Sequence, residues 1–237
     1  SYDPGVVAVL AITSPIIMDG TNIYFGGLDA GSIPKVFGVQ RSTLTLVKTI
    51  DTSGFTVRTA PSLRSISGTT YLFVGSDAIA GQAHLYRIDT TLNLVDSNNL
   101  TPLHSVNAAT TVSTAAVFAG DDGGRLHGTD VGLLMPNLSG WPYRDTANHS
   151  VANLDAGLFP IRAVAYVDPA TGRVYFGDWD LHFYILTSGG ALMPNFPVTI
   201  TPLSASEHFQ TAALPLSGKI AVGTTKGRLF IIDGSTG

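Results

Sequence analysis

The residues best suited to chemistry are Asp178, Asp180 and His182, in the run Asp-Trp-Asp-Leu-His. Carboxylates and imidazoles are ligands for Zn²⁺, and hard cations such as Ca²⁺ prefer carboxylate oxygens. Alternate positions along an extended chain face the same side, so the run predicts a metal site at these three residues. The other interpretation is an ordinary hairpin turn, because the further oxygens and the glycine of a calcium loop are missing. Trp179 would stack on a sugar ring if it is exposed, or pack against the turn if it is not.

A second set of candidates begins equivalent strands in the sequence. It consists of Lys35, His84, Arg125, His182 and Arg228. If the strands are equivalent, these side chains form a ring of cationic or titratable groups on one face, suited to an anion, a sugar or a protein. The alternative is local pairing with the acidic residues of the preceding turns, which contributes little to stability at an exposed site.

An insertion at about residues 141–159 carries the third set, Trp141, Tyr143 and Arg144. Aromatic and arginine side chains on a long loop are typical of protein or glycan recognition. A loop that packs over the edge of a sheet is the alternative. No nucleophile elbow, phosphate loop or metalloprotease motif occurs, so the sequence assigns no catalytic residue.

Repeats define the elements that position these residues. A β-rich run ends in glycine five times, and the gaps between these glycines are 49, 45, 57 and 46 residues. A turn dipeptide such as Ser67-Gly68 or Ser217-Gly218 precedes four of them, and an aromatic strand follows each. The glycines are Gly26, Gly75, Gly120, Gly177 and Gly223. The spacing and the strand pattern predict four-stranded antiparallel blades.

The fold class expected is therefore all-β, a propeller of five blades in one domain over residues 1–237. The last repeat stops after its third strand, so we expect residues 5–12 to complete this C-terminal blade and remove an exposed edge. A fragment of a seven- or eight-bladed ring, or a chain that needs partners to complete it, is the alternative. The third repeat is about ten residues too long, which is where the insertion lies.

Composition excludes several classes of protein. Charged residues make up 13% of the chain, the net charge is −4, and no basic patch predicts nucleic-acid binding. No apolar run reaches the length of a membrane helix, so we expect no membrane insertion. The chain has no cysteine, which excludes disulfides and thiolate metal sites within it. We expect a secreted, cell-surface or periplasmic location.

Two segments carry a resemblance to a known family. Residues 71–77 (Tyr-Leu-Phe-Val-Gly-Ser-Asp) with 84–89 (His-Leu-Tyr-Arg-Ile-Asp), and 220–223 with 227–233, resemble the repeats of quinoprotein-like β-propellers. The family consensus is a short strand ending in Gly-Ser, an acidic turn with glycine, and then Lys-Leu-Tyr-Ala-Leu-Asp. The resemblance covers most of the chain as degenerate repeats and implies an architecture.

Enzymes of this family bind pyrroloquinoline quinone with a calcium or lanthanide ion at the ring centre. This chain departs from them, because leucines 46, 94 and 192 stand where a blade tryptophan is usual, and no paired cysteines exist. We therefore predict no cofactor, with calcium and pyrroloquinoline quinone disfavoured. The function expected is a non-catalytic recognition or assembly module that binds a protein or a glycan. The alternatives are a quinoprotein-type or polysaccharide-active enzyme and a structural subunit of a larger extracellular or redox assembly.

Overall fold

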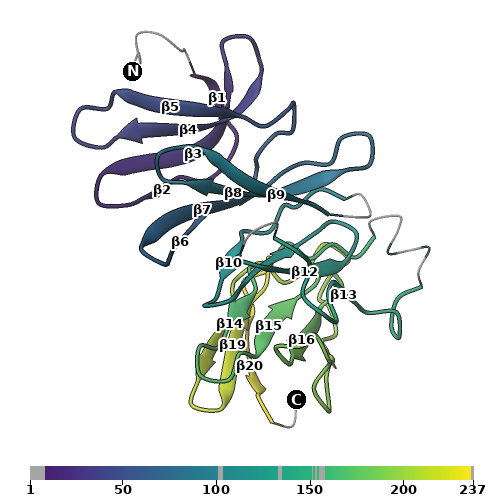
Figure 1. The fold of residues 1–237 in the computed structure, drawn as a ribbon. Coiled ribbons are helices and arrows are strands. Elements are labelled where there is room, and N and C mark those ends of the chain that lie inside the picture. Colours follow the sequence, from purple (N-terminus) through teal and green to yellow (C-terminus); the bar gives the residue numbers. More distant parts are fainter. Residues whose placement is uncertain are drawn as a thin grey trace. The chain divides into compact units, whose positions relative to one another are not determined.

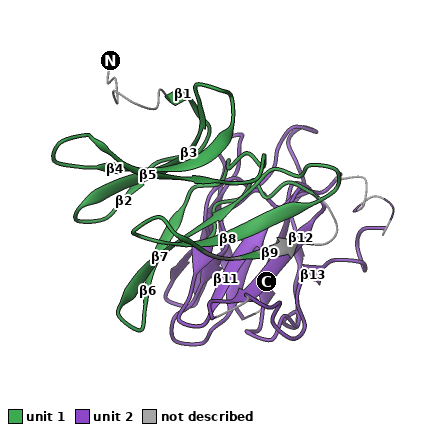
Figure 2. Ribbon diagram, turned by 45° about the horizontal axis from the view of Figure 1, so that its top comes forward, with its two compact units in different colours: residues 1–110 green, residues 111–237 purple. Residues whose placement is uncertain are grey.

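The computed structural model describes residues 9–100, 104–132, 135–150, 152, 154 and 158–235. These residues form five antiparallel sheets, as the alternation of apolar runs and glycine turns predicts. No helix in this described part combines the length and the apolar character that crossing a membrane requires. The chain divides into two compact units, residues 1–110 and 111–237 (Figure 2). Each unit is described by itself.

The first unit contains two sheets (Figure 1). In the first sheet the order is β1-β3-β4-β5, and β2 also pairs with β3; in the second it is β6-β7-β8-β9. The strands are β1 (Val9–Ile12), β2 (Ile17–Met18), β3 (Asn22–Asp29), β4 (Pro34–Gln40), β5 (Leu46–Asp51), β6 (Ser62–Ile66), β7 (Thr69–Gly75), β8 (Ala83–Asp89) and β9 (Leu94–Leu100).

The second unit contains three sheets, each a simple meander of neighbouring strands. The third sheet has the order β10-β11-β12-β13, the fourth β14-β15-β16-β17 and the fifth β18-β19-β20. The strands are β10 (Thr111–Val112), β11 (Ala116–Gly120), β12 (Arg125–Asp130), β13 (Tyr143–Arg144), β14 (Tyr166–Val167), β15 (Val174–Gly177), β16 (His182–Leu186), β17 (Val198–Thr199), β18 (Leu214–Leu216), β19 (Lys219–Gly223) and β20 (Leu229–Asp233).

The predicted turn dipeptides connect the first and second long strands of the sheets. Ser67 and Gly68 both have positive φ angles, and so do Ser217 and Gly218. Two consecutive positive φ values are what a type I′ hairpin turn requires, and they match the twist of the paired strands. The dipeptides therefore set the strand register that the sequence predicts.

A repeated contact joins a closing glycine of one sheet to an apolar side chain on the segment that precedes the next sheet. In the first unit, a Cβ added to Gly26 would lie 2.7 Å from Val57, and one added to Gly75 would lie 2.5 Å from Val106. In the second unit, one added to Gly177 would lie 2.4 Å from Phe209, and Gly120 meets Ile161 in the same way. The four apolar residues are almost completely buried. The closing glycines thus leave the space that these apolar side chains fill, and the contacts organise the core. We call these four pairs the glycine contacts.

The structure corrects the prediction for the N-terminal strand. Strand β1 pairs with β3 of the first sheet, with Ile12 opposite Gly27, and the fifth sheet has three strands among the described residues. Only residues 13–16 separate β1 from β2, and both run antiparallel to β3, so this short link keeps them on one partner. Residues 5–8 lie outside the described part of the chain. The single domain stays a prediction.

We predict that Gly75→Ala destabilises the protein by about 2–3 kcal/mol, because the new methyl group overlaps Val106 and Thr59 in a packed interior. Gly20→Ala is the matched control, since nothing lies within 4 Å of its added Cβ. We expect the control to change stability by less than about 0.5 kcal/mol. Urea unfolding monitored by tyrosine fluorescence measures both values.

The same experiment in a Val106→Ala background tests the cause. If the overlap with Val106 is responsible, Gly75→Ala costs less there than in the wild type, and the difference is a coupling energy. An equal cost in both backgrounds would show that the glycine contact does not determine the stability of this sheet.

Candidate functional site

The run from Asp178 to His182 forms the turn between β15 and β16. Oδ1 of Asp178 accepts hydrogen bonds from the backbone N–H groups of Asp180 at 3.0 Å and His182 at 2.9 Å. Leu181 has a φ of +61°, so the segment is a turn and not an extended strand. Asp178 thus uses one oxygen to hold the turn together, and the metal site at Asp178, Asp180 and His182 stays a prediction.

The long segment after β12 brings Asp145 and His149 to this turn. This segment contains the outer strand β13, in which Tyr143 pairs with Leu126, and the chain then turns at Asp145. Oδ1 of Asp145 accepts hydrogen bonds from the N–H groups of Ala147 and Asn148. Nε2 of His149 then lies 3.3 Å from Oδ2 of Asp178. The segment thus links the third sheet to the fourth.

Tyr184 lies buried between the two aspartates of this cluster. Its hydroxyl oxygen is 2.9 Å from Oδ2 of Asp145 and 2.8 Å from Oδ2 of Asp178. A phenol carries one proton and can donate to only one carboxylate at a time. The second carboxylate oxygen therefore needs a proton or a positive charge from another group, which His149 is placed to supply to Asp178. We call Asp145, His149, Asp178, Asp180, His182 and Tyr184 the Asp–His cluster.

The electrostatics of the cluster favour positive charge. Burial alone would lower the pKa of His149, but the hydrogen bond to Asp178 and the nearby carboxylates raise it above its ordinary value. Burial would raise the pKa of Asp145, yet hydrogen bonds from Asn148 and Tyr184 lower it. Burial, with the charges of Asp178 and Asp145, raises the pKa of Tyr184, which keeps the phenol protonated.

The other residues of the predicted ring each have local partners. Nζ of Lys35 lies 3.2 Å from the carboxylate of Asp29. Arg125 is only 2% exposed and lies 3.8 Å from Asp121, within the third sheet. His84 packs between Phe55 and Tyr86, and burial lowers its pKa. Local pairing therefore accounts for these side chains, and a role in binding stays a prediction.

Arg228 is held by a residue that the sequence did not single out. The guanidinium donates to both carboxylate oxygens of Glu207 at 2.6 Å, and to the carbonyl oxygen of Thr201 at 2.9 Å. The hydrogen bond from Arg228 lowers the pKa of Glu207 to about 2, although burial opposes this, and hydrogen bonds from Thr224 and Leu203 add to the lowering. Glu207 is the only glutamate in the chain, which was the one available signal.

The aromatic candidates take different positions. Trp141 is 7% exposed, packs edge to face on Phe118 and covers Gly128, so it is a core residue of the third sheet. Tyr143 packs against Phe176 and Tyr184, and Arg144 follows it in β13. The geometry matches the alternative in which this segment packs over the sheet edge.

Trp179 is half-buried on the turn. Its ring stacks on His208 at 3.4 Å and lies 4.8 Å from the guanidinium carbon of Arg162. A sugar that stacks on this ring would have to displace one of these two side chains. Its role as a sugar platform stays a prediction.

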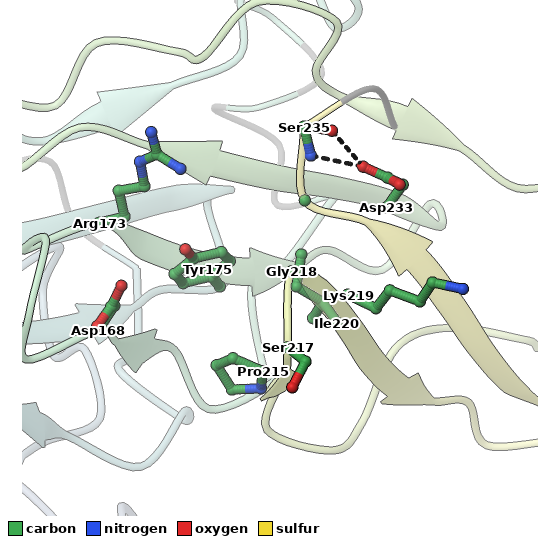
Figure 3. Close-up of a pocket in the computed structure, with 11 residues that line it drawn as sticks. Asp168, Arg173, Tyr175, Pro215, Ser217, Gly218, Lys219, Ile220, Asp233 and Ser235 are labelled. Carbon is green, nitrogen blue, oxygen red and sulfur yellow. Dashed lines mark hydrogen bonds between the residues drawn. The ribbon is translucent and has the colours of Figure 1, made fainter.

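A polar hollow of about 440 Å³ lies in the second unit between β14, β15 and the fifth sheet. Figure 3 shows Arg173 and Lys219 at opposite ends, with Tyr175 between them. Its carboxylates are committed to turns: Asp168 accepts from Thr171 and Ala170, and Asp233 accepts from Ser235. Among the described residues that line the hollow, both carboxylates are thus engaged in holding turns.

An apolar groove of about 400 Å³ lies on the first sheet. Ten residues line it, and all have apolar side chains. They are Val9, Leu10, Ala11, Ile12, Ile16, Ile23, Phe25, Val39, Leu44 and Leu46. Leu10, Ile12 and Ile16 are each more than half exposed. We call this the first-sheet groove.

The sheets and their glycine contacts define an all-β protein of the β-propeller class, as predicted. In structure the chain is similar to BamB from Moraxella catarrhalis, with 14% identity and a TM-score of 0.67 over 98% of this chain and 61% of that one. It is similar to a quinohemoprotein alcohol dehydrogenase from Comamonas testosteroni, with 13% identity and a TM-score of 0.67 over 97% of this chain and 42% of that one.

At these identities the likeness shows the fold alone, and it agrees with the predicted resemblance to quinoprotein-like propellers. The chain spans about three fifths and two fifths of the lengths of these two proteins. No protein-family model matches the sequence, and no curated protein matches it.

We predict that Glu207→Gln removes a part of the stability that the wild type loses as the pH falls below 4.5. The pKa of Glu207 is about 2 in the folded protein and 4.5 ordinarily, so its ionised form contributes stability above pH 4.5 that is lost as the pH falls toward 2. The difference in melting temperature between wild type and variant should shrink over this interval. Arg228→Gln should lose the same pH-dependent part of the stability. If the difference in melting temperature between the wild type and Glu207→Gln stays constant from pH 5 to about 2.5, Glu207 is not the source of this stability.

Proposed function

We propose that this chain is a non-catalytic β-propeller module that recognises a protein partner outside the cytoplasm. The observation that carries the proposal is the first-sheet groove, whose lining is entirely apolar and includes the exposed side chains of Leu10, Ile12 and Ile16. Contiguous exposed apolar surface of this kind costs free energy in water, and in soluble proteins it marks sites of interaction. The partner would insert apolar side chains from an extended segment.

The chemistry of the groove favours a protein over a glycan. A sugar is recognised by hydrogen bonds to its hydroxyl groups together with an aromatic platform, and the groove side chains offer no hydrogen-bonding group. Phe25 is the single aromatic side chain in the lining, and it is buried and stacked on Phe37. Leucine, isoleucine and valine side chains of a partner protein would fill this space.

The state of the carboxylates supports a binding role over catalysis. General acid–base catalysis needs a carboxyl group that is free to exchange a proton with a substrate. Asp145 and Asp178 share the hydroxyl of Tyr184 and cap turns, and Glu207 is held by Arg228. These three groups stabilise the fold, which supports a recognition role for this chain.

The location outside the cytoplasm rests on the cysteine-free sequence and on the quinoprotein-like fold. Membership of a larger assembly is part of the same proposal, because a partner in the groove would itself be a protein subunit. The absorbance of purified native protein distinguishes this binding role from the alternative of a quinoprotein-type enzyme, since a quinone or haem band would favour the enzyme.

Photocrosslinking tests the proposal. We predict that a photoreactive phenylalanine at position 44 captures one discrete partner protein in cells that express the chain naturally. The same residue at position 79 is the matched control, because Leu44 and Ile79 are both 45% exposed in the first unit and only Leu44 lines the groove. We expect no capture of this partner from position 79.

The double variant Ile12→Asp and Ile16→Asp should abolish capture from position 44, since two carboxylates in the groove disfavour apolar docking. Both side chains are exposed, so the fold should persist. Identical products from positions 44 and 79, a product that consists only of this chain, or no product would overturn the proposal. Binding of the protein to a glycan array that is lost with Trp179→Ala would favour a glycan partner instead.

A further inference from the structure

Two histidines and one aspartate of the Asp–His cluster have the arrangement of a metal site. One possible ligand atom each from His149, Asp180 and His182 lies within 4.8 Å of the other two. The two imidazole rings meet edge to face with their centroids 5.0 Å apart. Asp180 is 51% exposed on its side chain, so the site opens to solvent on one side.

The orientation of His182 points independently to a missing ligand. The residue is 8% exposed, and its buried Nδ1 has no hydrogen-bond partner. This nitrogen lies 3.8 Å from the carboxylates of both Asp178 and Asp180, too far for a hydrogen bond. A buried polar atom without a partner is costly, and a cation between Nδ1 and Asp180 would satisfy it.

The surroundings hold the ligands in place. Phe159 stacks on the ring of His149 at 4.0 Å, and Asp178 holds the backbone N–H groups of Asp180 and His182. The excess of carboxylate oxygens around the proton of Tyr184 adds negative potential beside the site. A cation would therefore enter a site whose ligands are already oriented and whose charge attracts it.

We propose that His149, Asp180 and His182 bind a single Zn²⁺ ion, with a water molecule or a partner's side chain as the fourth ligand. Two imidazoles and one carboxylate form a donor set that favours Zn²⁺. Ca²⁺ and Mg²⁺ bind less well there, because they prefer oxygen ligands. Zinc bonds of about 2.0–2.1 Å bring tetrahedral ligands to roughly 3.4 Å from one another. The three ligand atoms would therefore move closer together on binding. The sequence suggested Asp178 as a ligand, and this proposal takes His149 in its place.

The experiment uses the whole chain, freed of metal with a chelator and titrated with Zn²⁺ by calorimetry. We expect one ion per chain and a higher melting temperature in the presence of zinc. Co²⁺ in place of Zn²⁺ should give the visible absorption bands of tetrahedral coordination. Asp180→Asn should weaken zinc binding roughly tenfold or more, and its exposed position should leave the fold intact. His182→Gln should have at least the same effect.

His104→Gln is the matched control, because it removes a histidine outside the cluster and should leave zinc affinity unchanged. Equal zinc affinity of the wild type and Asp180→Asn would overturn the proposal. It would also be overturned if the wild type showed no saturable binding of one ion, or if His104→Gln lost as much affinity as Asp180→Asn. This test is independent of the first-sheet groove, so either proposal can fail without the other.

Discussion

The absence of a side chain on four closing glycines is the constraint on which the packing of this protein depends. Gly75, Gly120 and Gly177 end the second strand of their sheets and Gly26 lies within β3, and an apolar residue that precedes the next sheet occupies the space above each glycine. Because Val57, Val106, Ile161 and Phe209 are almost fully buried there, any Cβ would overlap atoms that have no room to move. Sheet-to-sheet contact within each unit therefore follows from a single residue type at a repeated position.

The Asp–His cluster depends on the same constraint. Three glycine contacts join residues 31 or 32 positions apart, whereas Gly120 and Ile161 are 41 apart. The extra residues form the segment that carries Asp145 and His149 to the fourth sheet. The glycine contact fixes both ends of this segment, so the additional residues form a loop. Tyr184 and Asp178 form hydrogen bonds with the polar side chains of this loop, Asp145 and His149.

Much of the fold could be predicted from local patterns, because a closing glycine, a turn dipeptide and an aromatic strand lie close together in the sequence. The burial of the candidate side chains and their interaction partners could not be predicted in this way. Arg125 and His182 begin strands as predicted, but their burial depends on neighbouring segments. Glu207 lies 21 residues before Arg228, and His149 lies 29 before Asp178, and no periodic pattern connects such pairs. The pairing of β1 with β3 is a long-range property of the same kind, and local patterns do not show it.

The unequal spacing of the glycine contacts separates two kinds of evolutionary change in this chain. Substitution at a closing glycine or at its apolar partner disturbs the packing between sheets, and such positions should vary little. The stretch between the third strand of one sheet and the apolar residue of the next lies outside these contacts and can gain or lose residues. The ten additional residues before Ile161 show that the scaffold has accepted such a change. We therefore expect new surface loops to arise in these stretches while the packing between the glycines and their apolar partners stays the same.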